Sequence, residues 1–250
     1  MLQFGSAHMN KSSKFKISVV FNLIISIVSI CLSAFCFSEI YFDSSLTAEQ
    51  IFHKNYKSIV EIKCSSVNGD SYGTGILVKE GAILTNYHVC SYTLLDEDYN
   101  NYEEISYRLS SDSEYFTASL MASDSDLDLA LLTIDREGLT NFVNIDISDL
   151  QYGEKCFSIG NANNLGISIS EGIISIPSIS ITYDNICQTY IQSNTDIYPG
   201  SSGGGLFNDK GNLIGITSFR LNDSSSDPIY SYGYSIPAER VEEFIESQIS

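Results

Sequence analysis

The stretch YPGSSGGG at residues 198–205 places a pair of serines among four glycines. Glycines beside a serine leave its hydroxyl unshielded, and they let backbone amides turn toward an oxyanion that develops nearby. A flexible turn is the alternative interpretation of the same residues. The GxSxG pattern also marks the nucleophile elbow of α/β-hydrolases, but that fold places its histidine after the serine, and no histidine follows Ser202. The stretch therefore indicates Ser202 as a candidate nucleophile of a different fold.

A histidine and an aspartate upstream of this serine have the chemistry to activate it. His88 lies near the end of the apolar run 82–90, where a histidine of the core is the ordinary interpretation. Asp128, however, directly precedes the apolar run 129–132, and a carboxylate entering a buried strand needs a cationic or hydrogen-bonding neighbour. His88, Asp128 and Ser202 follow one another at separations of 40 and 74 residues. This is one of the known chain orders of the serine hydrolase triad.

The sequence around these residues has the pattern of an all-β protein. Short runs of Ile, Val, Tyr and Thr alternate with Gly, Asn, Asp and Ser, as in 59–62, 75–78, 82–85, 129–134, 156–159 and 213–217. A capping box formed by Thr47 and Gln50 predicts a short helix that ends near Asn55. An apolar stripe at 241, 244, 245 and 249 predicts an amphipathic helix after Pro237. The acidic interval 96–114 is expected to be a long loop or a solvated hairpin.

Seven regions of the chain resemble the chymotrypsin-fold, or trypsin-like, serine proteases, and most closely their HtrA-like branch. They are 73–78 with 84–89, then 128–131, 158–161, 171–175, 191–193, 199–204 and 233–237. One such region is weak evidence, but seven in the family's order and near its spacing are specific. The resemblance implies an all-β fold of two antiparallel six-stranded β-barrels, with a short N-terminal helix, a C-terminal helix and a triad between the barrels.

The resemblance also assigns a role to each residue of the site. Ser202 is expected to be the nucleophile, His88 the general base and then acid, and Asp128 the carboxylate that fixes the imidazole tautomer. The backbone amides of Gly200 and Ser202 are expected to form the oxyanion hole. Ser218 matches the hydroxyl that supports the buried aspartate, with an ordinary surface serine as the alternative.

Three features bear on how far the resemblance extends. Asp126 competes with Asp128 for the acid's role, but the family places the acid directly before its Leu-Ala-Leu run. Ser201 stands where pancreatic-type proteases carry an aspartate that pairs with a new N-terminus, so activity is expected without a cleaved activation peptide. HtrA-like proteins usually continue into a PDZ domain, whereas the sequence given ends one helix after Pro237. Substrate choice is therefore expected to come from the cleft.

The candidates for the S1 pocket are Asp196, Ile197, Thr217 and Gly233. Asp196 falls where trypsins place the acid that selects Lys or Arg, and Gly233 could leave the floor of the pocket open. HtrA-like proteases usually prefer small aliphatic side chains, so an Asp196 that points elsewhere is the alternative. Selection of glutamate in this pocket is not expected, because Thr217 stands where glutamate-selective relatives carry a histidine.

The charge of the chain limits its partners. With 31 acidic and 13 basic residues the formal net charge is −18, which excludes a nucleic-acid surface built on Lys and Arg. No Cys/His cluster has zinc spacing, and neither a metal nor a cofactor is expected. The interval between His88 and Asp128, which holds a calcium loop in trypsins, contains the acids Asp96, Glu97, Asp98, Glu103 and Glu104. A solvated loop is the commoner explanation of these five residues. The expected partners are extended or unfolded polypeptides, hydrolysed through an acyl-enzyme; a catalytically silent binding module or effector is the alternative.

The first 38 residues have the layout of an export signal. Three lysines at 11, 14 and 16 precede the apolar run 17–37, and small residues at 36 and 38 offer a cleavage site. A run of 21 residues is also long enough to remain as a membrane anchor. The expected division is a signal peptide or anchor at 1–38 and a protease domain at 39–250, with barrels at about 56–140 and 145–236. The protein is expected to be secreted or periplasmic.

Export also changes the interpretation of the cysteines. Cys64, Cys90, Cys156 and Cys187 remain after the signal. One or two structural disulfides are expected among them in an oxidising compartment, and reduced, buried thiols are the alternative.

Overall fold

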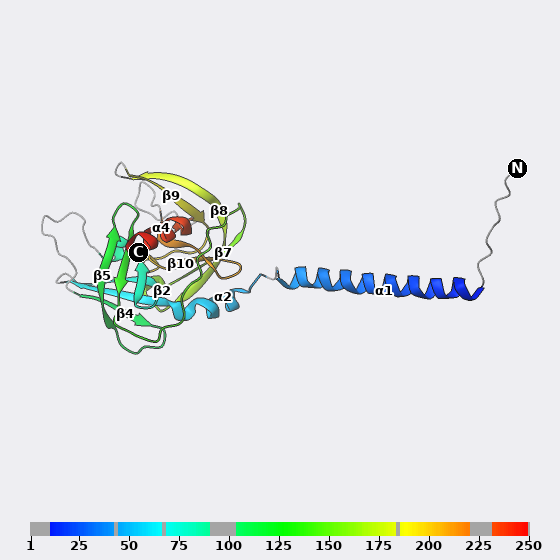
Figure 1. Cartoon of the computed structure of the whole chain (residues 1–250). Helices are drawn as coiled ribbons and strands as arrows, with labels where there is room; N and C mark the ends of the chain where they lie inside the picture. Colours follow the sequence, from blue (N-terminus) through cyan, green and yellow to red (C-terminus); the bar gives the residue numbers. More distant parts are fainter. Residues whose placement is uncertain are drawn as a thin grey trace. The chain divides into compact units, whose positions relative to one another are not determined.

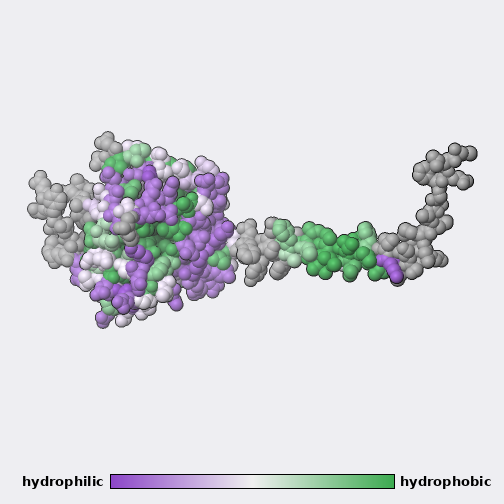
Figure 2. Space-filling model, viewed as in Figure 1, coloured by the Kyte–Doolittle hydropathy of each residue, from purple (hydrophilic) through white to green (hydrophobic). Residues whose placement is uncertain are grey.

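The computed structural model describes residues 11–42, 45–66, 69–90, 104–183, 186–220 and 232–249. The chain divides into two compact units, Met1–Ser45 and Leu46–Ser250, and each is described by itself. The first contains helix α1 (Lys11–Phe42) (Figure 1). Its segment Ser18–Phe35 has a mean hydropathy of 2.3, and apolar residues lie along the face of the helix seen in Figure 2. By length and composition this helix could cross a membrane.

The second unit consists mainly of two closed barrels of six antiparallel strands each (Figure 1). The spatial order of the first barrel is β1-β2-β3-β6-β5-β4. Its strands are β1 (Ile59–Ser66), β2 (Gly69–Lys79), β3 (Ala82–Thr85), β4 (Glu104–Leu109), β5 (Phe116–Asp124) and β6 (Leu129–Thr133), with the one-turn helix α3 (Tyr87–Cys90) after β3.

The second barrel repeats this architecture in the order β10-β11-β12-β9-β8-β7. Its strands are β7 (Lys155–Gly160), β8 (Ser168–Tyr183), β9 (Ile186–Ser193), β10 (Gly205–Asn208), β11 (Leu213–Phe219) and β12 (Gly233–Pro237). Two 3₁₀ turns, η1 (Tyr56–Ser58) and η2 (Ala162–Asn164), precede β1 and β8. The predicted all-β fold of two six-stranded barrels is confirmed.

Both predicted helices beside the barrels are also present. Helix α2 (Ala48–Asn55) begins at the predicted capping box, in which the Gln50 amide N–H donates to Thr47 Oγ1 and the Thr47 N–H donates to Gln50 Oε1. Helix α4 (Ala238–Ile249) buries Val241 and Phe244 against the barrels. The second unit therefore has a helix near each end of its chain, and a local sequence pattern predicted each of them.

Because side chains alternate along a strand, some of them pack inside their own barrel and others pack against the other barrel. In β1, Val60, Ile62 and Cys64 point into the first barrel, whereas Ile59 joins a layer shared by both barrels. That shared layer contains Ile76, Leu84, Leu129 and Leu131 from the first barrel, and Phe157, Ile159, Phe207 and Ile216 from the second. The two barrels are packed on each other through a continuous apolar contact, and the residues at the ends of their strands meet beside it.

The interval 96–114 differs in part from the expectation. Residues 91–103 lie outside the described part of the chain, but Glu104–Leu109 is strand β4, paired with both β1 and β5. Tyr107 and Leu109 are buried in the first barrel, and Arg108 pairs with Glu61 of β1. The acidic residues of this interval favoured a solvated loop, but residues 104–109 form an ordinary amphipathic strand.

The structure does not support the expected disulfides, because all four cysteines of the second unit are free thiols. Cys64 and Cys90 are buried neighbours in the first barrel, and Cys64 Sγ donates to the Val89 carbonyl at 3.1 Å. The hydrogen bond with Cys64, together with burial, raises the pKa of Cys90. Cys156 lies inside the second barrel, where burial raises its pKa to about 12, whereas Cys187 is exposed on β9. The buried thiols pack as small apolar side chains.

Candidate active site

Helix α3 carries His88 to the edge of the first barrel. The preceding residue Thr85 is fully buried at the end of β3, and its hydroxyl donates to the Thr74 carbonyl at 2.7 Å. The Asn86 side chain and the Tyr87 backbone N–H both donate to the carbonyl of Asp128, at 2.9 and 3.1 Å. The first turn of α3 is therefore fixed to the turn that precedes β6.

Asp128 binds His88 through both its backbone and its side chain. The Asp128 carboxylate accepts from the His88 backbone N–H at 3.0 Å, and both of its oxygens lie 2.9 Å from Nδ1. The φ of Asp128 is +57°, a left-handed conformation that Asp tolerates better than most residues and that turns the carboxylate back toward α3. Asp126, the competing acid, is exposed in the turn that Asp124 stabilises by accepting two backbone N–H groups. The turn thus places Asp128, not Asp126, at the histidine.

Two serines extend this contact into the second barrel. The Ser218 hydroxyl donates to Asp128 Oδ2 at 2.7 Å, and the Ser202 hydroxyl donates to the Ser218 carbonyl at 2.9 Å. His88, Asp128, Ser218 and Ser202 thereby form one connected chain of hydrogen bonds. In this arrangement the Ser202 hydroxyl points to β11, and a rotation about its Cα–Cβ bond is needed to bring it to the imidazole.

The backbone before Ser202 requires glycine. Gly200 has a φ of +92°, and a Cβ atom at this position would lie 2.4 Å from the Asn161 carbonyl oxygen. The Ser201 N–H donates to the Tyr198 carbonyl at 2.9 Å, which closes a turn over residues 198–201. This turn leads directly into Ser202 and contains Gly200, one of the two residues expected to supply the oxyanion hole.

Thr74 is a residue of the site that sequence reasoning missed. It is fully buried in β2, and its hydroxyl donates to the Gly200 carbonyl at 2.7 Å while accepting from the Asn161 N–H at 2.8 Å. Its backbone N–H also donates to the Ser202 carbonyl at 2.9 Å. A first-barrel side chain thus fixes the turn of the second barrel that carries the candidate oxyanion hole. The only sequence signal was its place in the Gly-Thr-Gly segment at 73–75.

The candidate S1 residues separate into two groups. Ile197 is buried, and a Cβ atom added to Gly233 would lie only 2.1 Å from Ile197 Cδ1, so the isoleucine occupies the space above this glycine. Thr217 is buried beneath the nucleophile turn, where its backbone bonds Gly203 and Gly204. Ile197 thus packs on β12 at Gly233, and Thr217 lies in the neighbouring strand β11.

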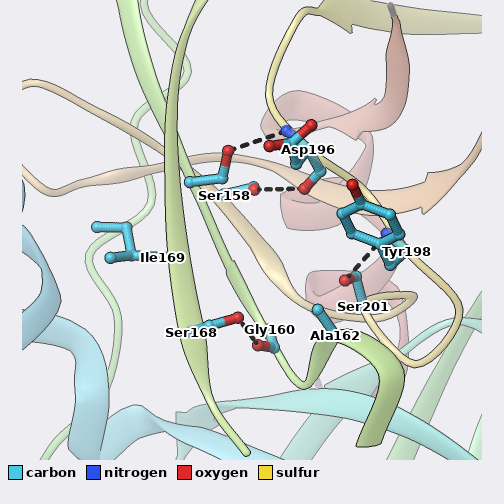
Figure 3. A pocket seen from close by; sticks show the side chains of 9 residues that line it. Ser158, Gly160, Ala162, Ser168, Ile169, Asp196, Tyr198 and Ser201 are labelled. Carbon is cyan, nitrogen blue, oxygen red and sulfur yellow. Dashed lines mark hydrogen bonds between the residues drawn. The ribbon is translucent and has the colours of Figure 1, made fainter. Parts of the chain in front are cut away.

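Asp196 lies in a different place. It is exposed and lines a cavity of about 170 Å³ together with Tyr198, Ser201 and residues of β7, η2 and β8 (Figure 3). Its backbone is fixed by two serines: the Ser158 hydroxyl donates to its carbonyl, and its N–H donates to Ser170 Oγ. The cavity is not lined by Ile197, Thr217 or Gly233. Of the S1 candidates, only Asp196 therefore lines this cavity.

An aromatic cluster joins strands β9, β11 and β12. Phe219 stacks on Tyr234 with ring centroids 5.2 Å apart, and Tyr190 meets Phe219 edge-on at 5.0 Å. Burial raises the pKa of Tyr190, and the negative charge of Asp128 raises it further.

Within the described ranges, no group of three or more His, Cys, Asp or Glu side chains is arranged to hold a metal ion. Of the acids proposed to resemble a calcium loop, only Glu104 is described, and it begins β4. His53 is exposed on α2, 4.0 Å from Glu49.

Residues 73–216, more than half of the chain, match the trypsin-like peptidase domain family. A probable periplasmic serine endoprotease DegP-like from Rickettsia prowazekii is 36% identical over 70% of this chain. The serine endoprotease DegS of Haemophilus influenzae is 29% identical over 76% of it. The chain spans about a third of the first relative and about half of the second.

A solved structure of the HtrA-type protease AlgW with a tripeptide superimposes with a TM-score of 0.68 at 28% identity. It covers 82% of this chain and 64% of that one. The chain therefore belongs to the trypsin-like peptidase family and is similar to its DegP, DegS and HtrA serine proteases.

Proposed function

We propose that this protein is a serine endopeptidase that hydrolyses extended or unfolded polypeptides through an acyl-enzyme on Ser202. The observation that carries the proposal is the connected chain of hydrogen bonds from His88 through Asp128 and Ser218 to Ser202. His88 and Asp128 make the base–carboxylate contact that general-base activation of a serine needs, and Ser218 connects Asp128 to the residue that we propose as the nucleophile. Family membership supports the same conclusion.

In the proposed reaction, Ser202 rotates from the Ser218 carbonyl to His88 Nε2 and attacks the scissile carbonyl carbon. His88 takes the hydroxyl proton, and Asp128 at Nδ1 stabilises the imidazolium and fixes its orientation. The oxyanion is bound by the N–H groups of Gly200 and Ser202. His88 then donates its proton to the leaving amine, and a water molecule activated by the same imidazole hydrolyses the acyl-enzyme.

For the residue that enters S1, we propose a small aliphatic side chain. Ile197 lies directly over Gly233 and narrows the pocket that a bare glycine would leave open. Asp196, the acid that would select Lys or Arg, lines the separate cavity of Figure 3. We also propose that residues 39–250 form the protease domain and that the apolar segment of α1 directs export or anchors the chain in a membrane.

Fluorophosphonate labelling of the full-length chain in detergent tests the proposed function. The label is expected on Ser202, located by mass spectrometry, and Ser202→Ala and His88→Ala are expected to abolish it, because losing the nucleophile or base typically costs about 10⁶ in turnover. Ser201→Ala is the matched control and should keep the label on Ser202. A folded wild-type chain that takes no label would contradict the proposal and favour a binding module of the same fold.

A further inference from the structure

Arg220 differs from the other arginines of this acidic chain. The other three make ion pairs: Arg108 with Glu61, Arg136 with Asp112 and Arg240 with Glu243. Arg220 instead holds its guanidinium over the ring of Tyr198, 4.6 Å from the centroid. Within the ranges that the structure covers, it has no carboxylate partner at ion-pair distance. An unpaired arginine is unusual in a protein with a net charge of −18.

The position of Arg220 in the chain places this charge close to the proposed active site. It follows Ser218 by two residues at the end of β11, and Ser218 contacts both Ser202 and Asp128. Tyr198, which holds the guanidinium, begins the turn that leads to Ser202. Arg220 is therefore connected to β11 through its backbone and to Tyr198 through its side chain, and both of these segments lead to residues around the proposed nucleophile.

The hydrogen bonds of Arg220 are incomplete. Its Nε atom is buried and has no hydrogen-bond partner in the structure. A buried donor without a partner costs free energy. Because Nε is closed to solvent whereas the residue as a whole is half-buried, a substrate group can reach the guanidinium only through its terminal nitrogens. The two terminal Nη groups of a guanidinium lie in one plane and can donate parallel hydrogen bonds to the two oxygens of a carboxylate. The stacking on Tyr198 fixes the plane of these groups before any substrate binds.

We propose that Arg220 determines specificity by binding the carboxylate of an Asp or Glu side chain in the substrate polypeptide. Two residues of strand span about 6.6 Å, so the bound side chain lies within about three residues of the scissile bond. Because Ile197 narrows the S1 pocket, the acidic residue flanks the one that enters that pocket. This inference rests on the proposed endopeptidase function and names the substrate class of that site.

Matched peptide pairs test the inference on the full-length chain. Internally quenched peptides carry either Glu or its isostere Gln at one of the six positions around the cut, and kcat/KM is measured for each pair. The wild type is expected to prefer Glu by about tenfold to a hundredfold at one position, the range of a charge-assisted hydrogen bond. Arg220→Gln should bring that ratio close to one, and Arg240→Gln should leave it unchanged. Ratios within one variant cancel differences in the amount of active enzyme.

A binding measurement separates this inference from the proposed function. Ser202→Ala is expected to bind the Glu peptide more tightly than the Gln peptide in fluorescence anisotropy, and the double variant with Arg220→Gln to bind both equally. Equal cleavage and equal binding of every pair, or a Glu preference that survives Arg220→Gln, would overturn the role of Arg220. Failure of Ser202 to take a fluorophosphonate, with the Glu preference in binding retained, would reject the enzyme and keep the binding site.

Discussion

Thr74 shows how a single hydroxyl connects the two barrels at the candidate site. Its Oγ1 donates to the Gly200 carbonyl and accepts from the Asn161 N–H, and both contacts cross from the first barrel to the second. The Gly200 carbonyl is thereby fixed by a hydrogen bond from the first barrel. We therefore regard Thr74 as a positioning residue for the proposed oxyanion hole.

Thr74→Val is expected to lower kcat by about tenfold to a hundredfold, because a peptide turn without its hydroxyl partner orients the oxyanion donors less well. KM for short peptides should change less. Removing the hydroxyl also leaves two buried polar groups unpaired and should cost about 1–3 kcal/mol in the free energy of unfolding. Steady-state kinetics and urea denaturation measure the two effects.

The conservative variant distinguishes positioning from stability. Thr74→Ser keeps the hydroxyl and should recover most of kcat, although it loses a buried methyl group. Thr133→Val, on the exposed face of β6, is the matched control and should behave as wild type. A Thr74→Val enzyme with unchanged kcat and reduced stability would show a structural role only.

The residues with distinctive chemistry were the ones that sequence could predict. His88, Asp128 and Ser202 carry chemistry that few other functions require in that order, and the structure joins them through Ser218. Thr74 looks like any β-branched residue of a strand, because its role depends on a contact with a residue 126 positions away.

At the level of elements, strand β4 and the turn after it were likewise not predictable from the sequence. Asp112 accepts from the Leu109 N–H at 3.1 Å and from both terminal nitrogens of Arg136, at 2.6 and 2.9 Å. This turn directs the chain from β4 into β5. Its acids look solvated in the sequence, whereas the side chain of Asp112 is only 7% exposed. Local sequence patterns predicted the strands that are rich in Ile and Val. Strand β4 could not be predicted in this way, because it forms through its pairing with β1 and β5.

Asp112 is expected to make the stability of the first barrel depend on pH. The hydrogen bonds from Arg136 hold the pKa of Asp112 below its ordinary value. The native state therefore binds this proton more weakly than the unfolded chain does, so the stabilisation is complete above about pH 4 and is lost as pH falls through the lowered pKa.

Asp112→Asn is expected to cost about 2 kcal/mol near pH 6, and the difference from wild type should shrink below about pH 3. Urea denaturation across this pH range measures it. Asp126→Asn changes an exposed carboxylate in the same barrel and should show little difference at any pH. A wild-type advantage that grows as pH falls would contradict the assignment.

At the scale of the whole second unit, the layer shared by the two barrels determines how they unfold. Ile76 and Leu129 from one barrel and Phe207 and Ile216 from the other belong to a single buried cluster. The candidate site is built from residues of both barrels, so its geometry depends on that layer remaining intact. The sequence indicated two barrels by resemblance, but which strand faces packed together could not be predicted from it, because alternation alone does not distinguish a barrel's interior from its outer contact.

Phe207→Leu tests whether the barrels behave as one cooperative unit. The smaller side chain leaves part of the shared layer unfilled and should lower the free energy of unfolding by about 1–2 kcal/mol. If the layer couples the barrels, amide hydrogen exchange should accelerate by the same factor in β1 and β2 as in β10 and β11, under conditions in which exchange requires global unfolding. The exposed substitution Ile147→Leu should leave both rates unchanged. Faster exchange confined to the second barrel would show that the barrels open independently, and the site would then be disrupted without unfolding of the first barrel.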